Sequence, residues 1–392
     1  MAPTSLRVLH LTSSFPRWPG DSVAPWLADL ARAEAESGME VHVLAPHDHG
    51  LAHRERWGEV QVHRFRYGPP GLERLAYRGG MLSAARSSTA SAALVPGLVG
   101  ALTAAAVAAT RKLRPDVVHA HWWFPAGVAA SVASTLTGVP WVLTLHGSDV
   151  HLAAQPGWGL GGRAVLRKAG AVVAVSAALA AEAARVWGVP VSRIGVARMP
   201  VAVPAPGLLA TPMPVAPPLR LAFVGRLVPE KGLDVLLGAM SLAVGRGLDA
   251  RLEVVGAGPE EERLRSMAAA LGDRVSWCGA LPPREVGAHL VAAHALVVPS
   301  RREGMGLVAL EALAHGRPVV ASRVGGLVEV LRDSADGLLV EPGDEGVLAD
   351  ALMRLPLRAP TAEVLGAHRL AAVASDHLAL YAKLLPPSPA KQ

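Results

Sequence analysis

The sequence has 392 residues, which is enough for two domains that each bury a full hydrophobic core. It is 51% hydrophobic and only 18% charged, which excludes a disordered chain, and its net charge of +6 suits acidic ligands such as nucleotides or an anionic membrane surface. Nucleic acid is not an expected partner, because the chain has 4% aromatic residues, no zinc-finger spacing and no block of lysines and arginines.

The first residues predict a β-strand, an α-helix and a second strand. The apolar strand covers residues 6–11, the helix runs over about residues 24–37, and the second strand covers residues 41–45. No secretory signal precedes the first strand. The single cysteine, Cys278, excludes an intramolecular disulfide and a metal site built from several cysteines. These features favour a cytoplasmic protein.

An uncharged stretch, residues 87–110, has the length of a membrane span. Alanine dominates this stretch and contributes little transfer free energy, and Pro96 and Gly97 interrupt it. We therefore predict a pair of packed helices that is broken at the proline.

Residues 54–86 are the most basic part of the chain, with seven arginines, three glutamates and interleaved aromatic residues. Such a region fits a peripheral patch that binds an anionic membrane surface, on the inner face of the membrane, and it also fits an ordinary solvated loop region. Both readings stay open. The arginines are Arg54, Arg56, Arg64, Arg66, Arg74, Arg78 and Arg86.

Histidines accompany the next two predicted strands. His119 and His121 alternate in the strand at residues 115–121, so they point to the same side, and we predict a structural pair because two histidines alone do not make a metal site. His146 follows the strand at residues 139–145, beside a glycine. Active-site residues of parallel sheets lie at this end of a strand.

A proline-rich segment divides the chain. Residues 200–218 contain seven prolines and no charged residue, which is typical of an interdomain linker. Residues 1–199 are therefore predicted to form one domain and residues 219–360 another. Residues 361–392 are predicted to supply a final helix, which packs back across the first domain, and a tail.

The second half contains a predicted diphosphate cradle. Gly225 and Arg226 follow a strand at residues 219–224, and Lys231 and Gly232 precede a helix, so two cations and two glycines gather at one strand end. A surface turn is the alternative. The following segment, residues 252–258, imitates a dinucleotide fingerprint but lacks its third glycine, which argues against an NAD enzyme.

The central motif runs from a strand at residues 294–298 through a loop into a helix. Glu303 lies in the loop, where Gly304 and Gly306 allow close approach of a ligand. Glu311 lies four residues after Leu307 on one helix face, which we predict to look inward. A carboxylate there requires partners, and either ligand hydroxyls or a neighbouring arginine would serve.

Together these motifs closely resemble the C-terminal half of the family 4 glycosyltransferases, and a similar motif begins at His146. The resemblance implies an α/β protein with the GT-B fold, in which two facing Rossmann-like domains with parallel sheets border an interdomain cleft. The family commonly has Gly-Gly in the first loop, where this chain has Gly20 and Asp21. The resemblance rests on Gly225, Arg226, Lys231, Gly232, Gly256, Gly258, Gly279, Glu303, Glu311, Gly325, Gly326 and Glu329.

The resemblance also implies roles for individual residues. Those implied for catalysis are His146, Glu303, Arg226 and Lys231. Those implied for binding the donor are Gly225, Gly279, Leu281, Met305, Gly306, Leu307 and Glu311. Those implied on the acceptor side are Gly20, Asp21, His121 and Asp149.

The function implied is that of a retaining glycosyltransferase. It would move a hexosyl group from a UDP- or GDP-sugar to an acceptor hydroxyl without a metal or cofactor, and the acceptor would be a lipid, a polysaccharide or a small metabolite. Two alternatives stay open: an epimerase or phosphorylase of sugar nucleotides on the same fold, and a regulatory protein that binds nucleotide sugars without catalysis.

Overall fold

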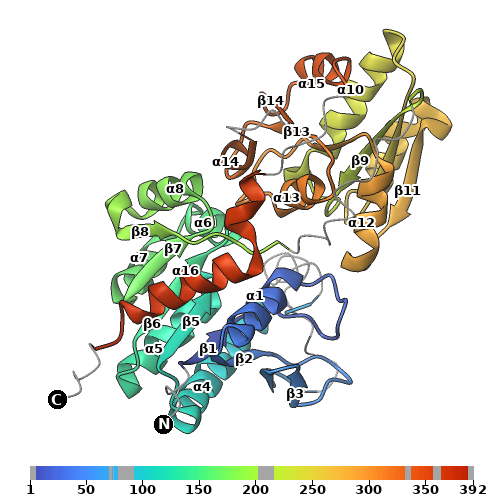
Figure 1. The fold of residues 1–392 in the computed structure, drawn as a ribbon. Coiled ribbons are helices and arrows are strands. Elements are labelled where there is room, and N and C mark those ends of the chain that lie inside the picture. The colour runs from blue at the N-terminus through green and yellow to red at the C-terminus, as the bar shows by residue number, and fades with distance from the viewer. Residues whose placement is uncertain are drawn as a thin grey trace. The chain divides into compact units, whose positions relative to one another are not determined.

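The computed structural model describes residues 6–69, 73, 75–77, 92–201, 216–331, 337–355 and 363–386. The chain divides into two compact units (Figure 1). The N-terminal unit consists of Met1–Pro200 and Leu370–Gln392, and the C-terminal unit consists of Val201–Arg369. Most of the predicted linker, residues 202–215, lies outside the described residues, and so do Arg74, Arg78 and Arg86.

The described strands of the N-terminal unit form one eight-stranded sheet with the order β3-β4-β2-β1-β5-β6-β7-β8. All neighbours are parallel except β3 and β4, which form an antiparallel edge. β5 and β6 are buried along their whole length, as expected for central strands covered on both faces. The strands are β1 (Arg7–Leu11), β2 (Glu40–Pro46), β3 (Arg54–Trp57), β4 (Val60–Phe65), β5 (Val117–His121), β6 (Trp141–Leu145), β7 (Ala171–Ala174) and β8 (Ile194–Val196).

Two helices of this unit begin at residues that favour a helix start. Pro25 occupies the first turn of α1, and the side chain of Ser176 accepts a hydrogen bond from the Leu179 amide at the start of α8. The helices are α1 (Pro25–Glu36), α4 (Val95–Leu113), α5 (Val128–Thr137), α6 (Ser148–Ala153), α7 (Gly159–Lys168), α8 (Ala177–Trp187) and α16 (Leu370–Ala382), with the π-helical turn η1 (Trp123–Gly127) and the 3₁₀ turn η2 (Val191–Arg193).

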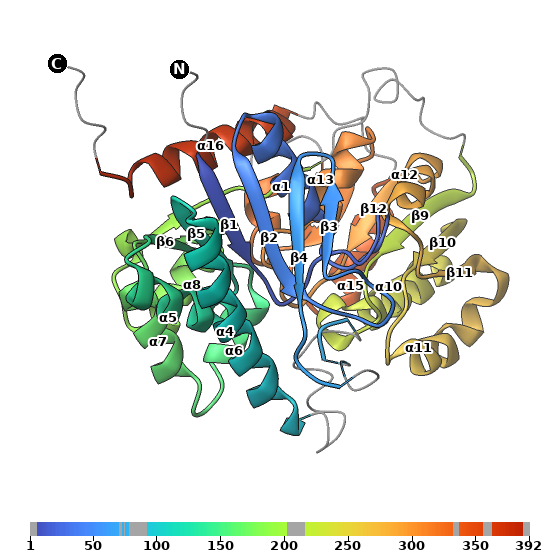
Figure 2. The same cartoon turned by 90° about the horizontal axis from the view of Figure 1, so that it is seen from below.

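Two helices bear directly on the predictions. α4 starts at Val95 with Pro96 in its first turn, whereas residues 87–91 of the predicted helix pair lie outside the described residues. α16 belongs to the N-terminal unit, where it packs beside α1 (Figure 2). Among the helices that the structure describes, none is long and apolar enough to cross a membrane.

The C-terminal unit is a six-stranded, fully parallel sheet with the order β11-β10-β9-β12-β13-β14. Its strands are β9 (Leu219–Val224), β10 (Ala250–Val255), β11 (Val275–Gly279), β12 (Ala295–Val298), β13 (Val319–Ser322) and β14 (Gly337–Val340). Its helical segments are η3 (Pro229–Lys231), α10 (Leu233–Gly245), α11 (Glu261–Met267), η4 (Ala268–Arg274), α12 (Pro283–Ala292), α13 (Leu307–Ala314), α14 (Leu327–Leu331), α15 (Glu345–Leu352) and η5 (Glu363–His368).

The strand order of the C-terminal unit reverses between β9 and β12. From β9 the chain moves outward to β10 and β11, and from β12 it moves outward in the other direction. Open parallel sheets bind ligands at such a switch point, outside the carboxyl ends of the strands. The loops after β9 and β12 are therefore where a ligand of this unit is expected.

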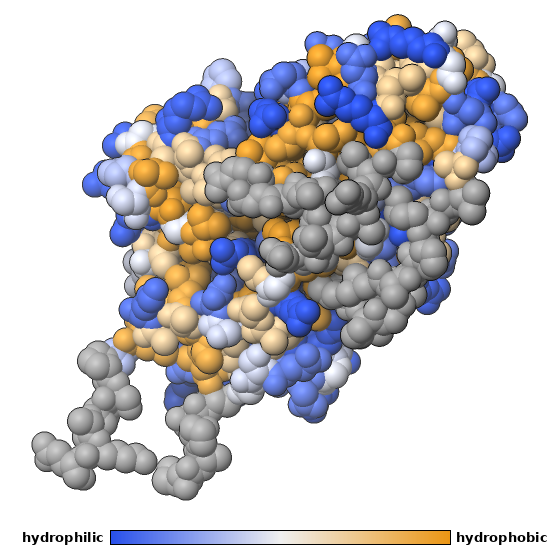
Figure 3. All heavy atoms as spheres, turned by 45° about the horizontal axis from the view of Figure 1, so that its top comes forward, coloured by the Kyte–Doolittle hydropathy of each residue, from blue (hydrophilic) through white to orange (hydrophobic). Residues whose placement is uncertain are grey.

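Each unit has its own apolar core. That of the N-terminal unit includes Val8, Val41 and Val117 from the sheet and Val373 from α16, which explains why the final helix returns to this unit. On the face seen in Figure 3, hydrophilic and hydrophobic residues are intermixed. Large apolar side chains that stay exposed, such as Leu160 on α7 at 84% and Leu136 on α5 at 54%, are distributed over several elements.

Candidate functional site

The switch point of the C-terminal unit brings together two of the predicted catalytic residues. Lys231, at the end of η3, places its Nζ atom 2.7 Å from Oε2 of Glu303, in the loop after β12. The hydroxyl of Ser300 donates to the same oxygen at 3.2 Å. Both partners of this ion pair are partly accessible, the side chain of Lys231 at 25% and that of Glu303 at 13%. The ammonium group of Lys231 is therefore held at the carboxyl ends of the strands, the edge of the sheet where a ligand is expected.

The loops after β9 and β12 are also tied through Arg301. Its guanidinium donates to both carboxylate oxygens of Asp234 at 2.8 Å, and its backbone amide donates to the carbonyl of Glu230 at 2.8 Å. A two-pronged pair of this kind fixes direction as well as distance. Arg301 and Asp234 therefore fix the loop that carries Glu303 relative to the loop that carries Lys231. Sequence reasoning missed both residues.

Glycines at this edge let backbone segments touch. A Cβ atom on Gly256 would collide with the carbonyl oxygen of Gly225, and one on Gly325 would collide with that of Glu303. The glycine that imitates a dinucleotide fingerprint thus has a packing role, because it lets the loop after β10 approach the loop after β9. The Gly256 amide also donates to the Gly279 carbonyl at 2.8 Å, which links the predicted base and diphosphate segments.

The predicted base-binding residues follow β11. Gly279 is the last residue of that strand and has a φ of 68°, a left-handed conformation that favours glycine. Leu281 is half-buried in the loop before α12. Arg226 is exposed at the end of β9. Gly279 and Leu281 thus lie at the carboxyl end of β11, and Arg226 lies just after the carboxyl end of β9, two strands away at the same edge of the sheet.

The helix that carries Glu311 begins at Gly306, whose φ of 83° allows the sharp turn from the loop into α13. Met305 is buried, whereas Leu307 and Glu311 are only half-buried. The predicted inward orientation of this face is therefore corrected: α13 packs Leu310 and the small residues around it into the core, and the row with Glu311 lies at the boundary of that packed face.

In the N-terminal unit, the loop after β1 is organised by Asp21. Its carboxylate accepts from Arg17 Nε at 2.8 Å, from the terminal nitrogen of the same guanidinium at 3.1 Å and from the Arg17 amide at 3.0 Å. Burial raises the pKa of Asp21, but these donors outweigh it and the pKa is lowered. Gly20 is exposed with a φ of 92°. The carboxylate of Asp21 is therefore bonded to Arg17 within its own loop.

Asp149 shapes the loop that presents His146. Its Oδ1 atom accepts from the amides of His146 at 3.1 Å and Gly147 at 2.9 Å, and Oδ2 accepts from the Trp123 amide at 3.3 Å. Burial raises the pKa of Asp149 to about 6 against these hydrogen bonds, which lower it. Asp149 is thus a loop-forming residue at 3% exposure.

His146 is joined to a buried chain of hydrogen bonds. Its Nε2 lies 3.2 Å from Nδ1 of His121, whose Nε2 lies 3.0 Å from Nδ1 of His10, and Nε2 of His10 lies 2.6 Å from Oε2 of Glu34. The rings of His119 and His121 stack with their centroids 4.3 Å apart, so the two side chains lie on the same side of β5, as the alternation predicted. A small hollow next to this chain of hydrogen bonds is lined by His146, Trp26, Leu30, His121, Thr144, Met199 and His377.

Sequence reasoning missed the residues that complete this network. Tyr381 and His377 of α16 both donate to Oε1 of Glu34, each at 2.8 Å. A signal was present in the sequence: Glu34 lies on the apolar stripe of α1, seven residues after Leu27. A carboxylate at such a position indicates buried hydrogen-bond partners.

Three groups of side chains in the part of the chain that the structure describes have ligand-type atoms within 4.8 Å of one another. In each group these atoms already take part in hydrogen bonds within the protein, which satisfy them without an ion. No residue of the predicted donor site belongs to them, and metal independence stays a prediction. The groups are His10, His119 and His121; Glu34, His119 and His377; and Glu253, Cys278 and His289.

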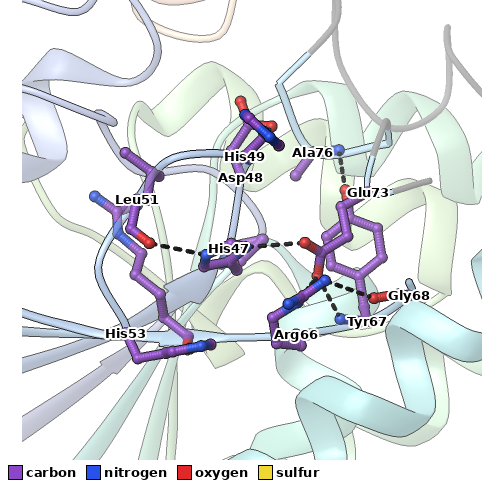
Figure 4. A network of polar contacts seen from close by, with 12 residues as sticks. His47, Asp48, His49, Leu51, His53, Arg66, Tyr67, Gly68, Glu73 and Ala76 are labelled. Carbon is purple, nitrogen blue, oxygen red and sulfur yellow. Dashed lines mark hydrogen bonds and ion pairs between the residues drawn. The ribbon is translucent and has the colours of Figure 1, made fainter. Parts of the chain in front are cut away.

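The basic region contains an internal polar network (Figure 4). His47 Nδ1 lies 2.9 Å from Oε2 of Glu73, and Arg66 Nε donates to Oε1 of Glu73 at 3.1 Å. Arg64 is buried, and it donates to Glu55 at 3.1 Å and to the Tyr77 hydroxyl at 3.0 Å. Arg64 and Arg66 therefore make hydrogen bonds within the N-terminal unit. Of the other arginines in this region that the structure describes, Arg54 and Arg56 are exposed.

Known protein families match both units. A family model described as "Glycosyl transferase 4-like domain" matches residues 23–200, and one described as "Glycosyl transferases group 1" matches residues 218–356. The 2-deoxystreptamine N-acetyl-D-glucosaminyltransferase of Streptomyces fradiae is 31% identical over 88% of this chain and 87% of that protein. The D-inositol 3-phosphate glycosyltransferase of Acidothermus cellulolyticus is 38% identical over 65% of this chain, which spans 63% of its length.

Solved structures match the fold of the whole chain. Sucrose-phosphate synthase from Thermosynechococcus elongatus is 22% identical and superposes with a TM-score of 0.75, covering 97% of this chain and 99% of that chain. HepE from Anabaena in complex with UDP-glucose is 20% identical with a TM-score of 0.61, covering 97% and 95%. The chain belongs to the family 4 glycosyltransferases, and its two parallel-sheet α/β units have the GT-B fold.

Proposed function

We propose that the protein transfers a hexosyl group from a nucleoside-diphosphate sugar to an acceptor hydroxyl. The observation that carries the proposal is the pairing of Lys231 with Glu303 at the switch point of the C-terminal unit. A cation and a carboxylate at this edge suit a ligand with an anionic diphosphate and a hydroxylated sugar.

The diphosphate is the leaving group of the proposed reaction. Its negative charge grows as the bond to the anomeric carbon breaks, so fixed cations stabilise the transition state more than the ground state. We assign this role to Lys231, to Arg226 and to the amides at the start of α13, which follow Gly306. Because these groups supply a positive field, the proposed reaction requires no metal.

The other assignments follow from the positions of the side chains. Glu311 is half-buried one turn into α13, and we assign it to the ribose hydroxyls of the donor. Glu303, whose carboxylate is already oriented by Lys231 and Ser300, is assigned to the transferred sugar. In the N-terminal unit, His146 is the residue that we assign to the sugar.

We further propose that the anomeric configuration is retained. The bond from the anomeric carbon to the leaving oxygen breaks, and a bond to the acceptor oxygen forms on the same face. The acceptor's proton passes to the departing diphosphate. This route requires no protein nucleophile.

The relatives guide the choice of substrates. HepE was solved with UDP-glucose, which supports a UDP-sugar as the first donor to test, with GDP-sugars second. The names of two curated relatives specify D-inositol 3-phosphate and 2-deoxystreptamine, both of which carry hydroxyl groups. A hydroxylated acceptor is therefore proposed, and lipid, polysaccharide and small-molecule candidates enter the same screen.

The test is a panel of nucleotide sugars with and without extracts that supply acceptors. Release of nucleoside diphosphate, slow without acceptor and faster with it, is expected for one donor. Lys231→Ala should abolish most of the release, whereas Lys112→Ala, which changes an exposed lysine of α4, should leave it unchanged. Tight binding without release would favour the regulatory alternative. The absence of both binding and release would overturn the proposal.

A further inference from the structure

Three side chains of types that bind metal ions meet beside the edge strand of the C-terminal sheet. Glu253 on β10 places Oε2 2.9 Å from Nδ1 of His289 on α12, and its Oε1 accepts from the thiol of Cys278 on β11 at 3.5 Å. The carboxylate oxygen, the imidazole nitrogen and the sulfur lie within 4.8 Å of one another. Three neighbouring elements, β10, β11 and α12, thus supply one ligand-type atom each (Figure 2).

A shift in strand register accompanies the position of the thiol. Val254 pairs with Trp277, but the next residue, Val255, pairs with Gly279, so Cys278 is an extra residue in the ladder between β10 and β11. An extra residue of this kind re-aims a side chain. Here that side chain is the single cysteine of the sequence, and its thiol points to the carboxylate of Glu253.

The separations are close to those around a tetrahedral zinc ion. Zinc bonds to sulfur, imidazole nitrogen and carboxylate oxygen are about 2.0–2.3 Å long, which sets the ligand atoms about 3.4–3.6 Å apart. The sulfur of Cys278 already has this distance from Glu253, and the nitrogen of His289 is closer by about half an ångström. Small side-chain rotations would therefore admit an ion, and water would take the fourth position.

The chemistry of the three groups suits a divalent ion that accepts sulfur and nitrogen ligands. A thiolate and a carboxylate carry two negative charges, and a neutral imidazole completes a set that favours Zn²⁺ over Mg²⁺, which prefers oxygen. Among the residues that the structure describes, no lysine or arginine pairs with Glu253, so no permanent cation neutralises it. An ion would replace the proton of the thiol, and the imidazole would carry its proton on Nε2.

The group can be reached by an ion from solvent. The side chain of His289 is 28% exposed, that of Glu253 is 33% exposed, and Cys278 is half-buried. The two histidine groups of the N-terminal unit differ in this respect, because all their members are buried. Accessibility therefore singles out the group of Glu253, Cys278 and His289.

The helix that carries His289 has little apolar anchoring. Among the ten residues of α12, all of which the structure describes, Leu290 is the only buried one. We propose that Glu253, Cys278 and His289 bind a zinc ion that joins α12 to β10 and β11 and stabilises the C-terminal unit. The ion would also restrict the loop between β11 and α12, which we predict to contact the base of the donor. The site itself does not depend on the proposed function.

Cobalt is the spectroscopic probe for this site. Full-length protein without a polyhistidine tag, with its thiol reduced and its metals removed by a chelator, is titrated with Co²⁺. We expect one equivalent to bind, with the near-ultraviolet charge-transfer band of a thiolate–cobalt bond and the visible bands of four-coordinate cobalt. Because Cys278 is the single cysteine, this band has one source. Zn²⁺ should displace the cobalt, and Mg²⁺ should not. Wild-type protein without the thiolate band would overturn the proposal, and this titration requires no variant to fold.

Variants locate the ion. Cys278→Ser should lose the thiolate band, and both Cys278→Ser and His289→Gln should bind Co²⁺ at least about a hundredfold more weakly, because loss of even an outer-shell partner costs about tenfold to a hundredfold. The matched control is His151→Gln. His151 lies 3.5 Å from Glu182, and these side chains are 25% and 34% exposed, close to the values of His289 and Glu253. The control should bind as the wild type does. Wild-type affinity in folded Cys278→Ser or His289→Gln would overturn the assignment.

Thermal unfolding tests whether the ion anchors α12. Zn²⁺ at about a hundredfold excess over its dissociation constant should raise the unfolding temperature of the wild-type protein by about 5 °C, because the ion binds the folded chain. Mg²⁺ should give no such rise, and neither should Zn²⁺ with Cys278→Ser. Bound zinc that leaves the wild-type unfolding temperature unchanged would contradict the anchoring. If the protein uses no nucleotide sugar, the proposed function fails, while these measurements still decide the metal site.

Discussion

Lys231 and Glu303 form an ion pair of 2.7 Å although 72 residues separate them in the sequence. The pair joins the two loops that flank the switch point of the C-terminal unit. It keeps a cation at the strand ends before a ligand arrives, so the site does not have to assemble this cation on binding.

Lys231→Ala should reduce kcat about a hundredfold and change KM little, because the lysine meets charge that develops mainly in the transition state. Initial rates of nucleoside diphosphate release measure both constants. Lys112→Ala, at an exposed position, is the control. Loss of donor affinity as large as the loss of kcat would contradict this role.

Glu311→Ala should weaken donor binding about tenfold to a hundredfold, since a carboxylate that accepts from two hydroxyls contributes about 1.5–3 kcal/mol for a charged hydrogen bond. Titration calorimetry with the nucleoside diphosphate measures the change. Glu262→Ala alters an exposed glutamate of α11 in the same unit and should bind normally. Equal affinities for the two variants would remove Glu311 from the site.

Gly325→Ala should disturb the loop of Glu303. The residue has a φ of 51°, and a Cβ there would collide with the Glu303 carbonyl. We expect about 3 kcal/mol of destabilisation, the sum of a left-handed backbone and overpacking, together with weaker donor binding. Gly343→Ala has a φ of 81° but an open surrounding, so about 1 kcal/mol is expected and normal binding. Denaturant unfolding would detect the difference, and similar stabilities would refute it.

The stability of the N-terminal unit should fall in mild acid. Burial lowers the pKa of His119 and His121 well below the ordinary value and that of His146 to about 3. These rings are neutral when folded and protonated when unfolded below about pH 6.5, so their contribution is complete above that pH and is lost as the pH falls. Asp149 acts oppositely: its pKa is raised to about 6, so its contribution is lost as the pH rises.

These four buried groups predict a net uptake of about two protons on unfolding near pH 5, three by the histidines less one released by Asp149, or about 3 kcal/mol per pH unit. His63, whose pKa burial lowers to about 4, adds to this uptake and makes the slope steeper. Urea unfolding between pH 5 and pH 6 measures this slope. His121→Gln should lower it by about one proton. A slope near zero would show that these rings are already charged in the folded protein.

The structure reduces the number of arginines in residues 54–86 that are candidates for binding a membrane. Arg64 is buried, and Arg66 is exposed but bonded to the buried Glu73. Arg54 and Arg56 are exposed, and Arg56 pairs with the exposed Glu59. If this region binds a membrane, cosedimentation with anionic vesicles should be salt-sensitive and should weaken in the double variant Arg54→Ala, Arg56→Ala. Binding that is identical for neutral and anionic vesicles would argue against an electrostatic patch.

Local sequence patterns predicted the repeating architecture well. The first strand and helix, predicted at residues 6–11 and 24–37, are Arg7–Leu11 and Pro25–Glu36, because apolar periodicity and glycine or proline boundaries are local signals. The final helix predicted within residues 361–392 is α16, which begins at Leu370 after η5 ends at His368.

The polar networks could not be predicted in the same way. His10 meets His121 across 111 residues and Glu34 meets Tyr381 across 347, and only the strand order and the return of α16 bring these partners together. The burial of Glu311 was overestimated because the helical period gives a common face for Leu307 and Glu311 but not its distance from the core. Packing against neighbouring helices decides that distance.

The central claim is that the loops after β9 and β12 bind the diphosphate of a nucleotide sugar. A crystal structure of the protein with a nucleoside diphosphate tests it most directly. The account predicts the diphosphate within hydrogen-bonding distance of Lys231 and the first amides of α13, with the ribose against Glu311. A nucleotide bound elsewhere, or Lys231 still paired with Glu303 and distant from the phosphates, would contradict it.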